Sequence, residues 1–406
     1  MRTTLFCSAV DVADAGAAAV LADACERAGV DGLSIATSYH AARDLHPHAR
    51  GRRVRHLAPG LWLPIDTQLW ADCGIAPQIA ADAETAGAIA TLVDAARRAG
   101  GEVDGWTVFL HADRHGEAAE VGAERNVFGD VYREQLCPAR PEVRAYAQTL
   151  ARAVVQAGMP TVLAESLHYH GLEHGLHHER FLFEPGEVVR FLLGLCFCDA
   201  CCAAARLEGV DSDRFRAEVA RIVQATLDTG EPAPGSVATL AAAGELVDGA
   251  MAAWLRARLA TVTMLIADVA AACRAEGGRL VVLDSSGAAK GYGDGDPQGD
   301  VAPAMAWRFG LDIAAISAHC AVEAIAYARS STRVADDLAA YRELIGETAS
   351  LGAIVRPFGV DCNSVENLGQ KLDTIRAAGA ERADFYHYGL MPLPTLDRIR
   401  AALHGS

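Results

Sequence analysis

The stretch Thr161-Val-Leu-Ala-Glu165 is a short apolar run that ends in a carboxylate, and it sets the pattern for the chain. Such a run predicts a parallel strand that is buried on both faces. Similar runs lie at 4–10, 32–40, 105–111, 279–284, 312–317, 352–357 and 383–388. Alanine-rich amphipathic stretches between them predict helices. Eight strands that alternate with helices predict an α/β protein of the (β/α)8 type, a TIM barrel.

An open, doubly wound α/β sheet is the main alternative to the barrel. That fold often carries a glycine-rich dinucleotide loop after the first strand, and no such loop follows residues 4–10. We therefore expect residues 1–406 to form one elaborated barrel. Within it, residues 166–276 are expected to supply a Cys/His-rich insertion after strand 4 and added helices before strand 5. Residues 52–66 are predicted to form an inserted hairpin.

The chain of 406 residues is acidic, with 36 Lys and Arg against 52 Asp and Glu and a net charge of −16. Surfaces that bind nucleic acid or anionic lipid need clustered positive charge, so neither partner is expected. The N-terminus lacks the apolar core of a signal peptide, and no uncharged apolar stretch reaches about 18 residues. We expect a cytoplasmic protein without a membrane span that acts on a small molecule. The sequence leaves a homo-oligomer open.

Polar residues follow the predicted strands at the end where a TIM barrel carries its catalytic groups. Glu165 is the strongest catalytic candidate, because a carboxyl group at the end of a buried strand can act as a general acid and base. Asp284 is either a second catalytic carboxylate or a helix N-cap, and Asp361 is a further catalytic candidate. The other polar strand-end residues are candidates for substrate binding: His40, His111, His168, His170, His319, Arg356, Tyr386, His387 and Tyr388.

Two of these assignments have direct alternatives. Arg356 either holds a substrate carboxylate or pairs with Asp361. Several aromatic side chains could stack on a sugar ring but are equally well explained as core residues: Tyr39, Trp62, Trp106 and Tyr388.

Residues 165–179 contain five histidines. Imidazoles at this density could bind a second divalent metal ion at the barrel mouth, with His174 and His178 on one helix face. The glycines in the run favour a loop instead, whose imidazoles donate to substrate hydroxyls or to the backbone. Both interpretations stay open at this point.

The segment Cys196-Phe-Cys-Asp-Ala-Cys201-Cys202 has the spacing C-x-C-x-x-C. Three thiolates at this spacing can converge on a tetrahedral Zn²⁺ ion, which needs a fourth ligand. Cys137, on a loop before a predicted helix, is favoured over Cys202 because adjacent residues rarely point the same way. The alternative is a group of buried thiols without a metal.

The order of these pieces resembles a known family. A Cys137-Pro-Ala-Arg-Pro-Glu-Val-Arg-Ala-Tyr146 segment, a strand that ends in Glu165, and Cys196-Phe-Cys-Asp-Ala-Cys201 leading into a helix are similar to the clan A glycoside hydrolases. The closest likeness is to the family 42 β-galactosidases and related uncharacterised glycosyl hydrolase-like barrels. The resemblance implies a structural zinc on Cys137, Cys196, Cys198 and Cys201, and acid/base duty for Glu165.

The chain also departs from that family. Ala164 stands where the family has an asparagine, and the insertion at 166–195 is longer and richer in histidine. The family's nucleophile is a glutamate at the end of the seventh strand, but here the seventh strand is followed only by Asp361. The departures leave the zinc site in place and put the retaining double-displacement mechanism in doubt.

Three functions follow from these observations. The first is a carbohydrate-active enzyme on a glycoside or sugar-like substrate, with Glu165 as acid/base and Asp284 or Asp361 as nucleophile, base or charge stabiliser. The second is an isomerase, epimerase, lyase or other hydrolase that depends on a divalent metal held by the strand-end histidines. The third is a non-catalytic sugar-binding barrel that lost its nucleophile.

Overall fold

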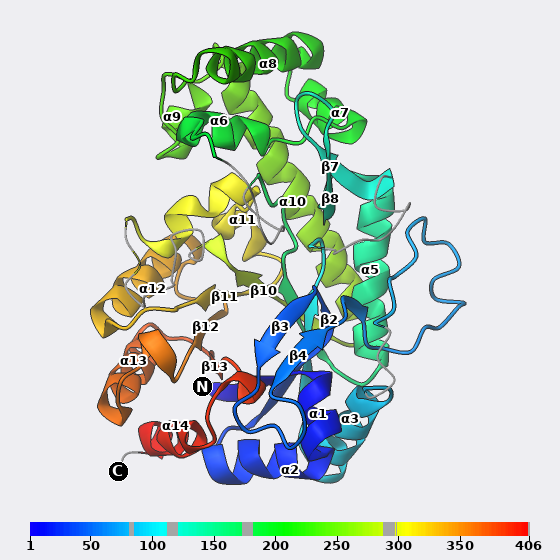
Figure 1. The fold of residues 1–406 in the computed structure, drawn as a ribbon, viewed down its shortest axis with the longest axis vertical. Coiled ribbons are helices and arrows are strands. Elements are labelled where there is room, and N and C mark those ends of the chain that lie inside the picture. Colours follow the sequence, from blue (N-terminus) through cyan, green and yellow to red (C-terminus); the bar gives the residue numbers. More distant parts are fainter. Residues whose placement is uncertain (81–84, 112–120, 173–181, 287–296, 298, 405–406) are drawn as a thin grey trace.

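The computed structural model describes residues 1–80, 85–111, 121–172, 182–286, 297 and 299–404. Eight parallel strands form a closed barrel in the order β1-β13-β12-β11-β10-β9-β6-β2, and β1 pairs with β2 to close it (Figure 1). The strands are β1 (Arg2–Cys7), β2 (Gly32–Tyr39), β6 (Val103–Val108), β9 (Thr161–Glu165), β10 (Arg279–Asp284), β11 (Ala321–Ile325), β12 (Leu351–Val355) and β13 (Arg382–Phe385). The predicted (β/α)8 barrel is confirmed.

The sixth strand lies later in the chain than predicted. Residues 312–317 contain the short helix α11 (Ile313–Ile316), and the barrel strand is β11. Asp312 starts this helix, because its side chain accepts a hydrogen bond of 3.0 Å from the backbone N–H of Ala315. An apolar run of four residues fits a helical turn as well as a strand, and the cap decides between them.

Helices cover the outside of the barrel. They are α1 (Ala9–Ala15), α2 (Ala17–Leu21), a π-helical turn (Ala22–Ala28), α3 (Ala88–Arg98), α5 (Pro141–Gln156), α10 (Ala250–Ala275), α12 (Ser331–Ile345), α13 (Val365–Ala377) and α14 (Pro394–His404). Serine caps set the starts of two of them: Ser330 accepts from the N–H of Arg333 and Ser364 from that of Asn367. The starts of α12 and α13 can therefore be read from local sequence.

Two sets of added elements extend the barrel. An antiparallel hairpin, β3 (Ala42–Leu45) and β4 (Val54–Leu57), follows β2, so the predicted hairpin begins earlier than residue 52; β5 (Gly60–Leu61) then pairs with β2. A second hairpin, β7 (Ala123–Arg125) and β8 (Val131–Leu136), precedes α5. After β9 come α6 (Gly186–Leu193), α7 (Asp199–Leu207), α8 (Ser212–Thr229) and α9 (Leu240–Gly244), which gather at one end of the molecule (Figure 1).

Helix α10 connects these added helices to the barrel. By length and composition it is apolar enough to cross a membrane, but 56% of its most apolar window is buried inside the protein. It packs against α5, α7 and α9. The burial accounts for its apolar composition as that of a core helix.

Alternation along each strand sorts the side chains into two cores. Phe6, Trp106, Leu163, Leu283 and Ile354 meet inside the barrel. Their sequence neighbours face outward and pack against the helices, among them Leu5, Cys7, Val162, Ala164, Val282, Ala353 and Val355. This alternation decides which strand-end residues can reach the barrel mouth.

The N-terminal end of the barrel interior is charged. Buried Arg382 lies 2.6 Å from Asp104 and 2.5 Å from Asp384, and 3.5 Å from Glu323. Its guanidinium also donates to the hydroxyls of Thr4 and Ser34. Burial raises the pKa of Glu323, and the neighbouring Asp384 raises it further. Arg382, together with Arg2, which lies 2.9 Å from Asp104, therefore offsets the charge of a group of carboxyls that has no access to water.

Replacing this arginine by an apolar residue of similar length should destabilise the fold. We expect Arg382→Met to lower the free energy of unfolding at pH 7 by about 3–5 kcal/mol, because it leaves buried carboxylates without their cation. Loss of the cation raises their pKa in the folded state, so the deficit should shrink as the pH falls and they take up protons. Urea unfolding at several pH values tests this, with Arg382→Lys as the control that keeps the charge. Equal stability of Arg382→Met and wild type would show that the charge network is not needed.

Candidate active site and metal centre

Glu165 faces the barrel interior at its C-terminal end. It continues the inward set of β9 that includes Leu163, while Ala164 faces the helices. Its Oε2 accepts a hydrogen bond of 2.6 Å from the indole Nε1 of Trp106. Burial raises the pKa of Glu165, and the charge of His40 and the bond from Trp106 offset this in part. A carboxyl group with a raised pKa in a barrel mouth is suited to give and take protons.

The backbone after Glu165 is held in an uncommon conformation. Ser166 has φ = 58°, in the left-handed region that residues with a side chain seldom adopt. The carbonyls of Glu165 and Ser166 accept from the N–H groups of Phe109 and Leu110, at 2.9 and 3.0 Å. The backbone hydrogen bonds between β6 and β9 therefore continue past the ends of both strands. They fix the direction of the residues that follow Glu165.

Aromatic rings surround Glu165. The ring centroid of Trp106 lies 4.8 Å from that of Tyr39 and 5.7 Å from that of Tyr386, and Tyr327 lies 6.0 Å from Tyr386. The hydroxyls of Tyr39 and Tyr386 are 3.5 Å apart. These residues pack on the inner core of the barrel. They give the mouth an aromatic floor that can contact the apolar face of a sugar ring.

Four histidines line up beside this floor. Ring centroids are 4.9 Å apart for His40 and His111, 5.8 Å for His111 and His170, and 5.1 Å for His170 and His168. His168 Nε2 also lies 3.4 Å from the hydroxyl of Ser285. The structure thus brings together four of the predicted substrate-binding histidines, which we call the imidazole row. His174 and His178 lie outside the described residues.

Two predicted catalytic residues are not placed at the mouth. Asp284 follows inward Leu283 and so faces the helices, where its carboxylate accepts from the Tyr341 hydroxyl at 2.5 Å and from Ser286. These bonds are those of a buried cap, the second of the two roles that the sequence left open for Asp284. Asp361 is fully buried and forms an ion pair with Arg356. This pairing is the second of the two roles considered for Arg356.

Three other predicted residues also have different surroundings from those expected. His319 is exposed and precedes β11, at the N-terminal end of the barrel. It was expected at the mouth because the sixth strand was wrongly predicted to precede it. Tyr388 points its hydroxyl to Asp23, at 2.8 Å. His387 is buried with its Nε2 4.0 Å from Asp11, although its ring lies 5.9 Å from that of Trp106.

The structure adds one carboxylate that the sequence interpretation missed. Asp44 lies on β3, where Ala42 and Asp44 are half-buried, His46 is buried, and Arg43 and Leu45 are exposed. His46 lies between two carboxylates, with Nδ1 3.2 Å from Asp11 and Nε2 3.8 Å from Asp44. Both contacts raise the pKa of His46 to about 9 against the effect of burial.

Asp44 and Glu165 act on the same pair of tyrosines. Burial, the neighbouring Tyr386, and the charges of Glu165 and Asp44 all raise the pKa of Tyr39. Two carboxyl groups, one from a barrel strand and one from the hairpin, therefore contribute to the raised pKa of this tyrosine. The sequence Ala-Arg-Asp-Leu of residues 42–45 does not alternate between apolar and polar residues, so it gave no signal for Asp44.

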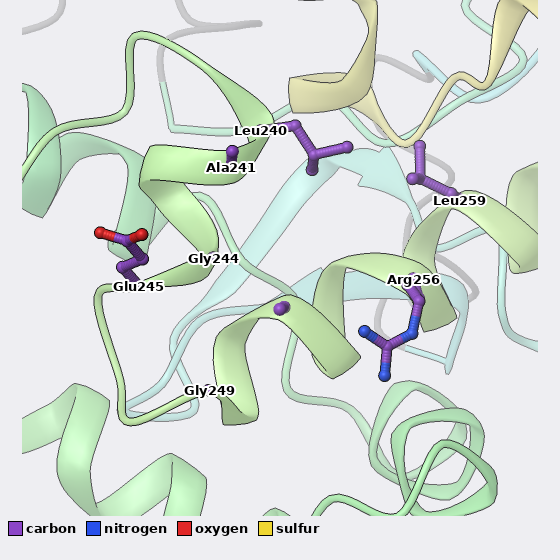
Figure 2. Close-up of a pocket in the computed structure, with 8 residues that line it drawn as sticks. Leu240, Ala241, Gly244, Glu245, Gly249, Arg256 and Leu259 are labelled. Carbon is purple, nitrogen blue, oxygen red and sulfur yellow. The ribbon is translucent and has the colours of Figure 1, made fainter.

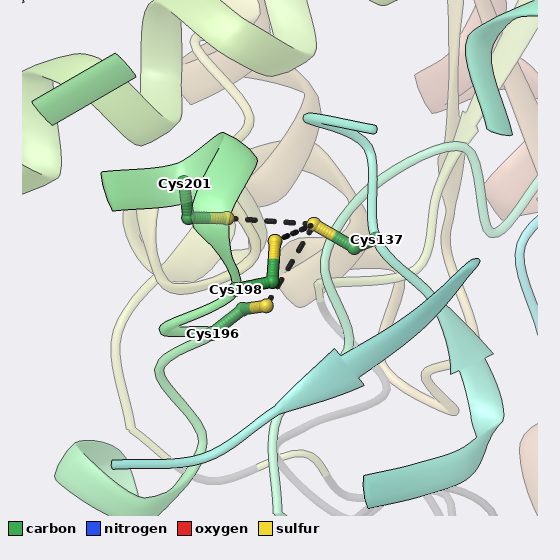
Figure 3. A group of neighbouring side chains, drawn as sticks. All are labelled: Cys137, Cys196, Cys198 and Cys201. Atoms are coloured by element: carbon green, nitrogen blue, oxygen red, sulfur yellow. Dashed lines mark hydrogen bonds between the residues drawn. The ribbon is translucent and has the colours of Figure 1, made fainter. Parts of the chain in front are cut away.

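Four buried cysteines form a compact cluster behind the mouth (Figure 3). The Sγ of Cys137 lies 3.4 Å from that of Cys201, 3.6 Å from that of Cys198 and 3.7 Å from that of Cys196. A tetrahedral Zn²⁺ site with Zn–S bonds of about 2.3 Å needs sulfur–sulfur distances of about 3.8 Å, so the cluster fits such an ion. Cys202 lies outside the cluster, as predicted.

The surroundings act differently on the four thiols. The backbone N–H of Arg125 donates to Cys196 Sγ at 3.3 Å. Hydrogen bonds from Cys137 and the other two thiols lower the pKa of Cys198, whereas burial raises the pKa of Cys137. Among the described residues, this is the one group in which three or more His, Cys, Asp or Glu ligand atoms lie close enough to hold a metal ion. In the described part of the chain, the imidazole row does not form such a group.

A separate pocket of about 560 Å³ opens between α9 and α10 (Figure 2). Its lining is mostly apolar, with the side chains of Glu245 and Arg256 at its edges. No strand of the barrel contributes to it, so it is distinct from the mouth.

No known family profile matches the chain, and no curated protein matches its sequence. Solved structures do match its fold. The catalytic domain of a β-amylase from Paenibacillus polymyxa aligns with a TM-score of 0.52 at 11% identity, over 97% of this chain and 94% of that one. A β-galactosidase from the psychrophilic Marinomonas ef1 gives 0.51 at 10% identity, over 99% of this chain and 59% of that one.

The C-terminal domain of a putative chitinase from Desulfitobacterium hafniense DCB-2 gives a TM-score of 0.50 at 8% identity, over 99% of this chain and 98% of that one. Identities this low establish the fold and leave the activity to be argued from the site. In fold, the chain is a (β/α)8 TIM barrel that is similar to these three proteins.

Proposed function

We propose that the protein is a carbohydrate-active enzyme in which Glu165 is the general acid and base on a glycoside or sugar-like substrate. The observation that carries this proposal is the position of Glu165, half-buried at the end of β9, bonded to Trp106 and surrounded by aromatic rings. The likeness in fold to a β-amylase and a β-galactosidase supports the substrate class.

The groups at the mouth divide the reaction between them. Protonated Glu165 gives its proton to the glycosidic oxygen as the bond to the leaving group breaks, and the carboxylate then takes a proton from water. The rings of Tyr39 and Trp106 contact the sugar face, and the imidazole row hydrogen-bonds to hydroxyls.

Asp44 is the second carboxyl group of the reaction. Asp284 faces the helices and Asp361 is fully buried beside Arg356, whereas Asp44 is half-buried. Asp44 lies on a hairpin that is pinned to the barrel, and its charge contributes to the raised pKa of Tyr39 and Tyr386, as that of Glu165 does. Arg55 of that hairpin lies 2.5 Å from Asp14, and His48 Nε2 lies 2.9 Å from the carbonyl of Tyr388. Asp44 thus supplies a second carboxylate. The lack of a nucleophile was the reason to consider a non-catalytic sugar-binding barrel.

The imidazole row is the feature that favours a metal-dependent isomerase, epimerase, lyase or other hydrolase. In the described part of the chain, its ring nitrogens do not form a group of three or more ligand atoms close enough to share an ion, which favours separate contacts to a ligand. We therefore assign the row to substrate binding.

The four-cysteine cluster holds Zn²⁺ in a structural role. Thiolate ligands that fill all four positions leave none open for substrate, as in other structural sites. When bound, the ion supplies a cross-link between the segment before α5 and the start of α7.

Glu165→Gln should lower kcat for an alkyl glycoside by about 10²–10⁴-fold with the fold retained, because the proton donor is lost. The loss should be much smaller for a dinitrophenyl glycoside, whose leaving group needs no proton. The wild-type rate should fall as the pH rises through the raised pKa of Glu165. A panel of aryl and alkyl glycosides measures this, with Glu102→Gln at the opposite end of the barrel as control. Full activity of Glu165→Gln on alkyl glycosides would exclude the assignment.

Asp44→Asn should lower the rate at least about 100-fold for both classes of leaving group, because the second carboxylate acts on the sugar carbon or on water. Arg43→Gln, on the solvent face of the same strand, is the matched control and should keep the wild-type rate. Product stereochemistry by NMR then separates retention from inversion. If Asp44→Asn affects only alkyl glycosides, Asp44 is not the second carboxylate.

The purified protein should contain one zinc ion per chain. Cys198→Ser should lose the ion and lower the thermal midpoint, whereas Cys202→Ser, which changes a buried thiol outside the cluster, should keep it. Elemental analysis and thermal unfolding with and without a chelator measure both effects. Loss of zinc from Cys202→Ser but not from Cys198→Ser would contradict the assigned ligand set.

A further inference from the structure

We propose that Tyr169 is a positioning residue that couples the four-cysteine cluster to the imidazole row. Its side chain contacts the cluster, and its sequence neighbours His168 and His170 belong to the row. The inference rests on the proposed zinc and goes beyond it, because it makes the geometry of the mouth depend on the occupancy of the cluster.

The contact of Tyr169 with the cluster is direct. Its hydroxyl lies 3.3 Å from Cys201 Sγ, and the residue is 1% exposed. A thiolate that binds a metal carries no proton, so the phenol must be the donor in this hydrogen bond. Arg258 holds the ring from the other side, with its guanidinium carbon 3.9 Å from the ring centroid. The side chain is thus clamped between a cation and a metal ligand.

The backbone of Tyr169 carries this restraint to its neighbours. Its N–H donates to the carbonyl of Phe309 at 3.1 Å, and its carbonyl lies 2.6 Å from Nδ1 of His168. The Nε2 of the same imidazole faces the hydroxyl of Ser285. The position of the Tyr169 peptide therefore sets the orientation of the His168 ring at the mouth.

A second connection runs through β7. The backbone N–H of His170 donates to Glu124 Oε1 at 3.2 Å. The next residue, Arg125, donates its N–H to Cys196 Sγ at 3.3 Å and accepts from the N–H of Phe197 at 2.6 Å. His168 is therefore held by a residue that contacts the cluster, and His170 by the sequence neighbour of such a residue. Groups that hydrogen-bond to metal ligands orient those ligands, and the same bonds orient the groups.

The first test compares full-length wild-type protein with and without zinc, by NMR of the histidine side chains. Signals assigned to His168 and His170 should move when zinc is removed, while that of His319, exposed at the opposite end of the barrel, should stay. This comparison needs no substrate and no variant. Unchanged signals of His168 and His170 in the zinc-free protein would overturn the coupling.

The second test removes only the hydroxyl. Tyr169→Phe should bind zinc about 10–100-fold more weakly in competition with a chromophoric chelator, because a bond to a metal ligand is lost. In the zinc-loaded variant, the His168 and His170 signals should lie between those of the loaded and zinc-free wild type. Tyr132→Phe is the matched control, since its hydroxyl donates to the carbonyl of Leu193 at 2.8 Å and to no cysteine.

The outcomes separate the coupling from the metal site itself. If the wild type binds no zinc, the proposed metal centre fails and the coupling with it. If zinc binds but loaded Tyr169→Phe has wild-type histidine signals, or Tyr132→Phe shows the same changes, the coupling through Tyr169 fails and the metal centre stands.

Discussion

Adjacent residues of a barrel strand point to opposite sides, and the character of this site depends on that alternation. On β9 it places Leu163 and Glu165 inside and Ala164 outside. On β10 it places Leu283 inside and Asp284 outside, where Tyr341 and Ser286 satisfy the carboxylate. Both acids end apolar strands, yet one faces a cavity mouth and the other a helix. A shift of one residue would exchange their roles.

A second constraint fixes what lies around the mouth. Cys137 precedes α5, whereas the other three cysteines lie 59–64 residues later, at the start of α7. The chain between them includes Glu165, His168 and His170. A metal ion bound by the four cysteines would join the two ends of this stretch, and a closed loop has fewer conformations than an open one. Such a link would help an irregular segment to carry ordered imidazoles.

The barrel and the cysteine set could be predicted because their signals are local. Short apolar strands, capped helices and the spacing of Cys196, Cys198 and Cys201 are properties of neighbouring residues. Cys137 was identified as the fourth member from its place before a helix, and the structure groups it with the other three. The sixth strand was misplaced because an apolar run of four residues does not distinguish a helical turn from a strand until its cap is considered.

The arrangement of the site was harder to predict because it depends on pairing between distant strands. Which residues of a strand face the barrel interior depends on the register of the strands, and the register cannot be read from the sequence. Asp284 and Tyr388 therefore could not be excluded from the site in advance. Asp44 was missed because its strand belongs to a hairpin outside the barrel, and its approach to the mouth depends on contacts of His46 and Arg55 with α1. Four of the six strand-end histidines did converge, and all four follow strands that were placed correctly.

The bond between Trp106 and Glu165 adds directionality to the acid. Trp106 donates to Oε2, and an oxygen that accepts from an N–H group is the less favourable place for the carboxyl proton. When the carboxyl group of Glu165 is protonated, its proton therefore lies on Oε1. Burial among aromatic rings disfavours the charged form, whereas the indole N–H favours it, so the two effects oppose each other at one group. A carboxyl group balanced in this way can change its protonation state during a reaction while the fixed indole holds its orientation, which is what a general acid that later acts as a base requires.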